Sequence, residues 1–343
     1  MGNNKSIIIV GGGIAGLKVA EILSKLNINT TIIEKGREVG GNLLKWDRIF
    51  PDGKYAVEVI NALKNDLGNT NIITNSEVFS INKDNNSFIV LSSNSRTHKA
   101  DAVVLTTGFE IFDATKKEEY GYGIYDNVIT SVDLESIFKN KSNLLRKDGK
   151  RPQKIAFIHC VGSRDIKVNN LHCSSVCCIT AVKQAIELKE LYPELDIYCF
   201  YMDLRMYGRH FEEIYYEAQE KYNINFIRGR LSEASETIDG KLLLKAEDTL
   251  IGKPLRLTVD TVVLMVGISP DKKVKNITQE LNIKWSDDGF INVEDEHIRQ
   301  NHTNINGIFV AGTITGPKSI QMTINDAANA AASIYKYLTN TNE

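Results

Sequence analysis

Short apolar runs along the chain alternate with segments of helical period, and this alternation predicts an α/β fold. The first apolar run, at 7–10, enters a glycine-rich turn, which leads into a helical pattern at 17–26 and a second apolar run at 30–33. The other expected helices lie at 55–67, 132–138, 177–191, 211–221 and 320–338, and the other expected strands at 71–74, 100–105, 155–158, 196–201, 225–228 and 308–311. Alternating segments near 78–92 and 231–246 are typical of β-hairpins.

An internal repeat divides the chain into two similar units. The stretch 101–108 (DAVVLTTG) resembles the stretch 260–267 (DTVVLMVG), and each follows an apolar strand, at 7–10 and 155–158. We therefore predict two dinucleotide-binding-type, Rossmann-like domains, with the second inserted in the first. The expected bounds are 1–112 and 257–343 for the first domain, 113–150 for a crossover and 151–256 for the second domain.

The turn after the first strand reads GGGIAG and has the spacing of a dinucleotide-binding motif. In such a motif Gly11 makes the tight turn, Gly13 lets the backbone approach a pyrophosphate, and Gly16 allows close packing of helix and strand. A diphosphate is favoured there because free N–H groups and the helix dipole both attract an anion. Glu34 ends the second strand, where its carboxylate can accept the ribose hydroxyl groups.

The residues that follow Glu34 favour FAD over NAD as the bound dinucleotide. Glu34 and Lys35 precede the pair Gly40-Gly41, which resembles the first segment of flavoproteins with two dinucleotide domains. In such flavoproteins the residue at the Val78 position contacts adenine, and the segment at 312–320 covers the flavin. Thr313 stands where these flavoproteins usually have aspartate. The expected FAD-binding residues are Gly11, Gly13, Ile14, Ala15, Gly16, Glu34, Lys35, Gly41, Asn42, Leu43, Val78, Thr107, Gly108, Gly312, Thr313, Ser319 and Ile320.

Composition excludes several classes of function. The 343 residues are 42% hydrophobic and 24% charged, with a net charge of −2, so no basic field favours nucleic acid. No apolar run reaches the length of a membrane span, and the first apolar run is too short for an export signal, so we expect a cytoplasmic protein. Five cysteines in such a protein indicate metal or redox chemistry rather than structural disulfides.

Four of the five cysteines lie where the second unit would otherwise carry a phosphate-binding glycine loop. They are Cys160, Cys173, Cys177 and Cys178, with the spacing C-x12-C-x3-C-C. Four thiolates suit a [4Fe–4S] cluster or a zinc ion, and a vicinal disulfide, a catalytic thiol pair or four core cysteines are the alternatives. Two adjacent cysteines can both ligate one metal only at a helix end or in a turn. Cys199 alternates as a strand residue and is expected in the core.

These residues carry a resemblance to the A subunit of heterodisulfide reductase. The matching segments are VGSRD (161–165), CSSVCC (173–178), FYMDLR (200–205) and FEE (211–213), together with the glycine turn, DRIFP (47–51) and 312–318. The resemblance implies a thioredoxin-reductase-like flavoprotein fold that binds FAD, a homodimeric oxidoreductase of that family, and a [4Fe–4S] cluster held by Cys160, Cys173, Cys177 and Cys178.

Departures from the family narrow the expected function. The methanogen protein is much longer and carries ferredoxin-type cysteine sets, which this sequence lacks. The chain is more similar to the short A subunit of the heterodisulfide reductase-like complex of sulfur oxidisers. That likeness implies an electron-transfer subunit working with B- and C-type subunits and a lipoate-binding protein. A stand-alone NAD(P)H-dependent disulfide reductase using Cys177 or Cys178 is the first alternative, and a zinc-bearing scaffold with structural FAD is the second.

Overall fold

The computed structural model describes residues 5–340 as two compact units. Unit 1 combines the described residues up to Leu44 with Ala56–Glu110 and with the chain from Ser269 onward, and unit 2 combines Lys45–Tyr55 with Ile111–Ile268. The chain leaves and re-enters unit 1 through two strands that pair with each other, β8 (Phe109–Ile111) and β17 (Ile268–Pro270). Unit 2 is therefore inserted into unit 1.

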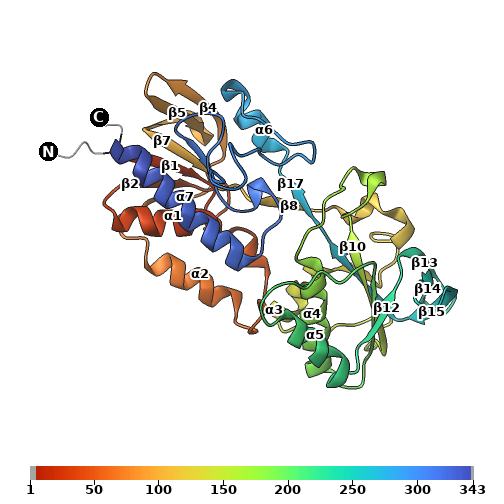
Figure 1. The fold of residues 1–343 in the computed structure, drawn as a ribbon. Helices are drawn as coiled ribbons and strands as arrows, with labels where there is room; N and C mark the ends of the chain where they lie inside the picture. The colour runs from red at the N-terminus through yellow and green to blue at the C-terminus, as the bar shows by residue number, and fades with distance from the viewer. Residues whose placement is uncertain (1–4, 341–343) are drawn as a thin grey trace. The chain divides into compact units, whose positions relative to one another are not determined.

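Unit 1 is built on a five-stranded parallel sheet in the order β18-β7-β1-β2-β3 (Figure 1). Its strands are β1 (Ser6–Val10), β2 (Asn29–Ile33), β3 (Asn71–Ile73), β7 (Ala102–Leu105) and β18 (Ile308–Val310). On one face lie α1 (Ile14–Lys25), α2 (Ala56–Asn65) and α7 (Ile320–Asn340), and on the other lie β4 (Val78–Asp84), β5 (Ser87–Ser92), β6 (Arg96–Ala100) and α6 (Lys273–Ile277). The central strands are apolar on both sides because both faces are covered.

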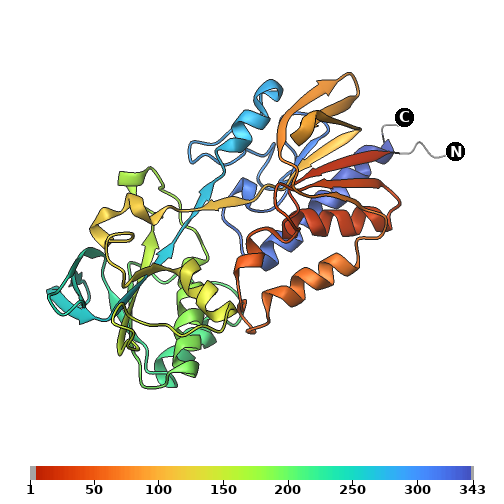
Figure 2. The ribbon, with the colours of Figure 1, turned by 180° about the vertical axis from the view of Figure 1, so that it is seen from behind.

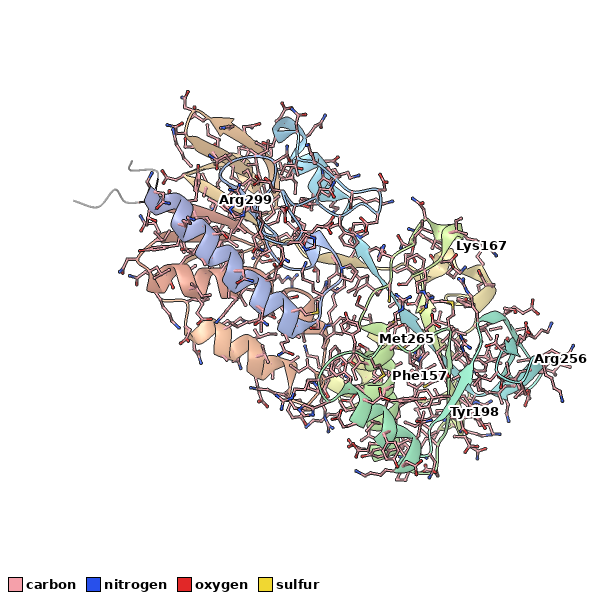
Figure 3. All side chains as sticks on the ribbon, viewed as in Figure 1. Phe157, Lys167, Tyr198, Arg256, Met265 and Arg299 are labelled. Atoms are coloured by element: carbon pink, nitrogen blue, oxygen red, sulfur yellow. The ribbon has the colours of Figure 1, made fainter. Side chains whose placement is uncertain are left out.

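Unit 2 repeats this plan around the parallel order β12-β11-β10-β16-β9 (Figure 2). Its strands are β9 (Val128–Thr130), β10 (Lys154–Val161), β11 (Asp196–Tyr201), β12 (Asn225–Arg228) and β16 (Thr261–Val266). One face carries α3 (Ser131–Lys139), α4 (Cys177–Leu191) and α5 (Phe211–Glu220), and the other carries the antiparallel strands β13 (Leu231–Glu236), β14 (Leu242–Asp248) and β15 (Lys253–Val259). Phe157 and Met265, from neighbouring strands, pack in the helix-side core (Figure 3).

The two repeated stretches occupy equivalent places, since β7 pairs with β1 and β16 pairs with β10. The units divide at Ile268 rather than at the expected residue 256, because β16 joins the second sheet. The segment 113–150 is likewise more than a crossover, since it contributes β9 and α3 to unit 2. Within residues 5–340 no helix has both the length and the apolar content needed to cross a bilayer.

The segment Lys45–Tyr55, expected in the first domain, is held in unit 2 by buried polar groups of α3 and α4. Asp47 N donates to Glu135 Oε2 at 2.9 Å, and Lys183 Nζ donates to Arg48 O at 2.8 Å. Lys183 also pairs with Glu135 at 2.6 Å and with Glu187 at 3.2 Å. Desolvation by burial raises the pKa of Glu187 to about 7, although Lys183 opposes that rise.

We expect Glu187→Gln to stabilise the protein at pH 8 by about 1–3 kcal/mol. The pKa of Glu187 is higher in the folded chain than the ordinary value of 4.5, so the folded state binds more protons between pH 4.5 and 7. The contribution of Glu187 to stability therefore falls as pH rises through that window, and the amide removes this slope. Thermal unfolding at pH 5 and pH 8 measures the difference. Glu190→Gln, on the exposed end of α4, should keep the wild-type pH dependence, and an unchanged slope in Glu187→Gln contradicts the assignment.

Candidate functional site

The glycine turn of unit 1 joins β1 to α1 with its backbone tightly packed. A Cβ on Gly16 would lie 2.1 Å from Gly11 O, so only glycine lets α1 approach the strand this closely. Gly41, at φ +59°, passes beside the turn, and a Cβ on it would lie 2.9 Å from Gly13 Cα. By contrast, the nearest atom to a Cβ on Gly13 would be 4.0 Å away, which leaves its backbone open to a ligand. Gly16 thus allows close packing of helix and strand, and Gly13 leaves its backbone accessible, which are the two features that a dinucleotide-binding turn needs.

Glu34 lies beside this turn at the end of β2 and is buried. Its Oε2 accepts a hydrogen bond from Gly12 N at 2.6 Å, and its Oε1 accepts one from Gly36 N at 2.6 Å. Each carboxylate oxygen can accept more than one hydrogen bond. The carboxylate is therefore fixed in position by the backbone and still has acceptor capacity for ribose hydroxyl groups.

The carboxyl ends of β7 and β18 bring further predicted residues to the same turn. Thr106 Oγ1 donates to Gly11 O at 2.7 Å, and a Cβ on Gly312 would lie 2.9 Å from the Cβ of Ala15. A Cβ on Gly108 would lie 3.7 Å from Thr313 Oγ1. Thr107 Oγ1 is buried and has no hydrogen-bond partner among the described residues. Since buried hydroxyl groups are normally hydrogen-bonded, this orphaned atom fits a site completed by a cofactor.

The turn that follows β18 is fastened to α7 by a charged pair. Asp326 Oδ2 accepts from Gly312 N at 2.7 Å, and Lys318 Nζ donates to Gly312 O at 3.1 Å. Lys318 lies 3.7 Å from Asp326, and burial lowers the pKa of its ammonium group. Ser319 Oγ accepts from Met322 N at 3.2 Å, so Ser319 caps the helix that begins at Ile320. The predicted cover of the flavin is thus a rigid turn.

The remaining predicted FAD residues belong to several elements of unit 1. Asn42 Nδ2 donates to Phe109 O at 3.1 Å, whereas Leu43 is buried. Lys35 is exposed and pairs with Asp271 at 3.6 Å. Val78 is buried at the start of β4. Ile14 and Ala15 form the first turn of α1. The roles of these side chains toward FAD stay predictions.

In unit 2 the strand β10 continues to Val161, where unit 1 has its glycine turn. Its pairing with β16 shifts between Ile158 and Val161, and Cys160 in this bulge has φ +59°. A Cβ on Gly162 would overlap the ring of Phe112, at 2.1 Å, so the corresponding space is already filled by a side chain. This unit therefore lacks the open backbone that a pyrophosphate needs.

The other three clustered cysteines follow a closed loop that returns to the end of β10. Arg164 N donates to His172 O at 3.0 Å, and Asp165 N donates to Asn170 O at 2.8 Å. Cys173 is half-buried and accepts from Ser175 N at 3.3 Å. Cys177 and Cys178 are the buried first residues of α4, so the adjacent pair does lie at a helix end.

Three of these thiols interact directly. Hydrogen bonding from Cys177 lowers the pKa of Cys160, with the cations of Arg164 and Arg230 acting in the same direction. Hydrogen bonding from Cys177, helped by His159, lowers the pKa of Cys178 to about 4, and the pKa of Cys177 itself is raised. Cys178 therefore has thiolate character at neutral pH, which is the form that binds metals, and the pKa of Cys160 is shifted in the same direction. Burial raises the pKa of Cys199, which lies inert in β11 as expected.

The site offers sulfur donors with a cation beside them. Cys160, Cys177 and Cys178 interact with one another, whereas Cys173 joins them through the Arg164 guanidinium, which is within electrostatic range of both Cys160 and Cys173. Among the described residues, no group of three or more histidine, cysteine, aspartate or glutamate side chains is placed so that it could hold a metal ion as it stands. The chemistry of the donor set, four thiols next to a guanidinium, fits an iron–sulfur cluster.

A buried ionic network that the sequence patterns did not predict supports the cysteine loop. Asp165 and Lys117 are both 2% exposed and lie 2.7 Å apart, and Arg230 also donates to Asp165. Arg230 lies in the short link between β12 and β13. No sequence motif in this link indicates that Arg230 pairs with Asp165. Lys167, two residues after Asp165, is exposed on this loop (labelled in Figure 3). His210 is exposed immediately before α5.

A family model described as pyridine nucleotide-disulphide oxidoreductase matches residues 4–156 and 179–333. The chain belongs to this family. It is therefore an oxidoreductase, as predicted. The stretch between the two matched parts is 157–178, which holds all four clustered cysteines. This family member thus departs from its family's pattern where the second phosphate-binding turn would be.

Curated relatives confirm the resemblance seen in the sequence. An iron-sulfur A subunit of the CoB–CoM heterodisulfide reductase of Methanopyrus kandleri is 44% identical over 237 residues, which is 67% of this chain and 36% of that protein. The corresponding iron-sulfur A subunit of Methanocaldococcus jannaschii is 39% identical over 242 residues, which is 69% of this chain and 37% of that protein. The matched region therefore spans little more than a third of these relatives.

Solved structures confirm the thioredoxin-reductase-like fold. Thioredoxin reductase of Lactococcus lactis superposes with a TM-score of 0.69 at 18% identity, covering 98% of this chain and 99% of that one. Thioredoxin reductase of T. acidophilum gives a TM-score of 0.66 at 18% identity, covering 97% and 98%. At this identity the likeness concerns the fold, so the function must be argued from the sites.

Proposed function

We propose that this chain is a FAD- and iron–sulfur-containing electron-transfer subunit of a heterodisulfide reductase-like complex. The observation that carries the proposal is the replacement in unit 2 of an open glycine turn by four cysteines. Three of their thiols interact at the end of β10 and the start of α4. When bound, FAD supplies two-electron chemistry and a [4Fe–4S] cluster supplies one-electron transfer.

The residues of unit 1 support the FAD half of the proposal. Open backbone at Gly13 and the amino end of α1 would receive the diphosphate. Glu34 would accept the ribose hydroxyl groups, and its negative charge disfavours a 2′-phosphate. The orphaned hydroxyl of Thr107 would gain the hydrogen bond that burial denies it. The Asp326–Lys318 pair would hold the 312–318 turn over the cofactor.

The residues of unit 2 support the iron–sulfur half. Cys160, Cys173, Cys177 and Cys178 would each supply one thiolate. The amino end of α4 and the Arg164 guanidinium would offset the negative charge that these thiolates bring. Four thiolates suit zinc as well as an iron–sulfur cluster. The relatives are iron-sulfur subunits, which favours iron over zinc.

The physiological role follows from the relatives and stays a proposal throughout. The relatives are subunits named for heterodisulfide reductases. We propose that this chain acts with B- and C-type subunits and a lipoate-binding protein, as a cytoplasmic homodimer in sulfur or thiol oxidation.

One observation supports a second candidate, a stand-alone NAD(P)H-dependent disulfide reductase. The pKa of Cys178 is lowered to about 4 beside the protonated Cys177, which is how a nucleophilic thiol pair is activated. The filled space at Gly162 argues against it, because NAD(P)H would need an open phosphate-binding turn in unit 2.

Anaerobic purification with iron, sulfide and flavin quantitation tests the proposal. We expect about one FAD and about four iron atoms per chain, with broad visible absorbance beside the flavin bands. Zinc in place of iron, or a metal-free protein whose flavin is rapidly bleached by NADPH and reoxidised by a disulfide, would contradict it. Subunits that co-purify with the intact chain identify the complex.

A further inference from the structure

We propose that Arg164 sets the reduction potential of the cluster held by the four cysteines, by donating a hydrogen bond and a positive charge to its sulfur. This inference rests on the proposed function, since it concerns the same site. In this proposal Arg164 changes the reduction potential of the cluster, whereas the thiols of the four cysteines bind the iron. Four observations carry it.

The first observation is an unused donor. Arg164 Nη1 is buried and has no hydrogen-bond partner among the described residues. A buried N–H left without an acceptor costs about 1–3 kcal/mol, and more when the group is charged. The guanidinium therefore points to an acceptor that the protein itself does not supply.

The second observation is where the guanidinium lies. It is within electrostatic range of the sulfurs of both Cys160 and Cys173, which come from opposite ends of the cysteine loop. A cluster bound by both cysteines would therefore lie within reach of the positive charge of Arg164. A sulfide or thiolate sulfur of that cluster is an acceptor of the required kind, because it is negatively charged and takes N–H donors.

The third observation is that the orientation of Arg164 is fixed. Its Nη2 pairs with Asp203 Oδ2 at 2.8 Å, and the Asp203 carbonyl oxygen lies 3.6 Å from Cys178 Sγ. Asp203 thus links Arg164 to a third cysteine. Because a guanidinium is planar, a bond to Asp203 through one nitrogen sets the direction of the other. The backbone of Arg164 has φ +53°, which is uncommon for a residue with a side chain.

The fourth observation is charge balance. Asp203 is shared with Arg228, whose Nη2 lies 3.8 Å from Asp203 Oδ1. Two arginines around one carboxylate leave a net positive charge beside the thiols. One-electron reduction adds a negative charge to the cluster, so a nearby cation and N–H donor stabilise the reduced form and raise its potential.

Potentiometric titration followed by low-temperature electron paramagnetic resonance tests this on the intact, anaerobically purified chain. We expect Arg164→Gln to keep its iron and flavin but to shift the midpoint to a more negative value. The expected size is at least a tenfold fall in the equilibrium constant for cluster reduction, which is about 59 mV for one electron. Arg164→Lys keeps a charge but loses the planar fork, so its midpoint should lie between the two.

Arg228→Gln is the matched control, because it removes a positive charge from the same carboxylate without removing the donor that faces the cysteines. Its midpoint should shift clearly less than that of Arg164→Gln, because Arg228→Gln removes a charge but keeps the N–H donor of Arg164. A midpoint of Arg164→Gln equal to that of Arg228→Gln overturns the inference. If Arg164→Gln holds no iron, Arg164→Lys decides, and a wild-type midpoint in that variant overturns the inference. Iron-free wild-type protein would instead refute the proposed function.

Discussion

Cys177→Ala should lose most of its iron while keeping its flavin. Cys177 interacts with both Cys160 and Cys178, so its removal takes the central member from the thiol group. Alanine offers no ligand, and we expect iron to fall from about four atoms to below about one per chain. Flavin should remain near the wild-type content because the residues that fit FAD belong to unit 1.

Cys199→Ala is the matched control for this loss. Cys199 is a fully buried cysteine of β11 in the same unit, and burial raises the pKa of its thiol. Its replacement should leave iron content unchanged and cost only the packing of one sulfur atom. Equal iron content in Cys177→Ala and Cys199→Ala would remove Cys177 from the ligand set. Loss of flavin together with iron in Cys177→Ala would show that the two sites fold as one.

Asp165→Asn is expected to destabilise the chain by about 3–5 kcal/mol, which is the usual cost of removing one partner from a buried ion pair. Asp165 accepts from Lys117 at 2.7 Å, from Arg230 and from Lys167 N at 3.0 Å, all within unit 2. The amide leaves the ammonium group of Lys117, which is 2% exposed, with Glu119 as its remaining carboxylate partner at 2.6 Å. Thermal unfolding at pH 7, followed by circular dichroism, measures the change.

The pH dependence of the same variant has a definite sign. Although desolvation opposes it, hydrogen bonding from Lys117 lowers the pKa of Asp165 below its ordinary value of 3.8. The stabilisation is therefore present above that value and is lost as pH falls through the lowered pKa. Asp165→Asn should lack this acid-side loss. Glu233→Gln breaks an exposed pair with Lys245 and should cost less than about 1 kcal/mol. A cost as small as this in Asp165→Asn would contradict the structural role of the network.

Both candidate sites were predicted from local patterns in the sequence. The run 7–10, the GGGIAG turn and Glu34 form one continuous strand–turn–helix–strand unit, so spacing alone indicates a dinucleotide cradle. The four clustered cysteines are likewise close in sequence. They follow the apolar strand at 155–158, where a phosphate-binding glycine loop would otherwise lie, and this position indicated sulfur chemistry in place of nucleotide binding. Both patterns can be recognised without the fold, because the spacing of residues within one helix, strand or turn is a local property of the sequence.

The surroundings of both sites required the folded chain. Lys183 donates to the carbonyl of Arg48, which is 135 residues away in the sequence, and Arg230 donates to Asp165, which is 65 residues away. No local sequence pattern predicts either contact. Burial and these distant partners set the high pKa of Glu187, the low pKa of Asp165 and the unused donor on Arg164. The sequence by itself determined which chemical groups are present and which elements carry them. Tertiary structure decided their charge state and their neighbours, because desolvation and ion pairing depend on long-range packing.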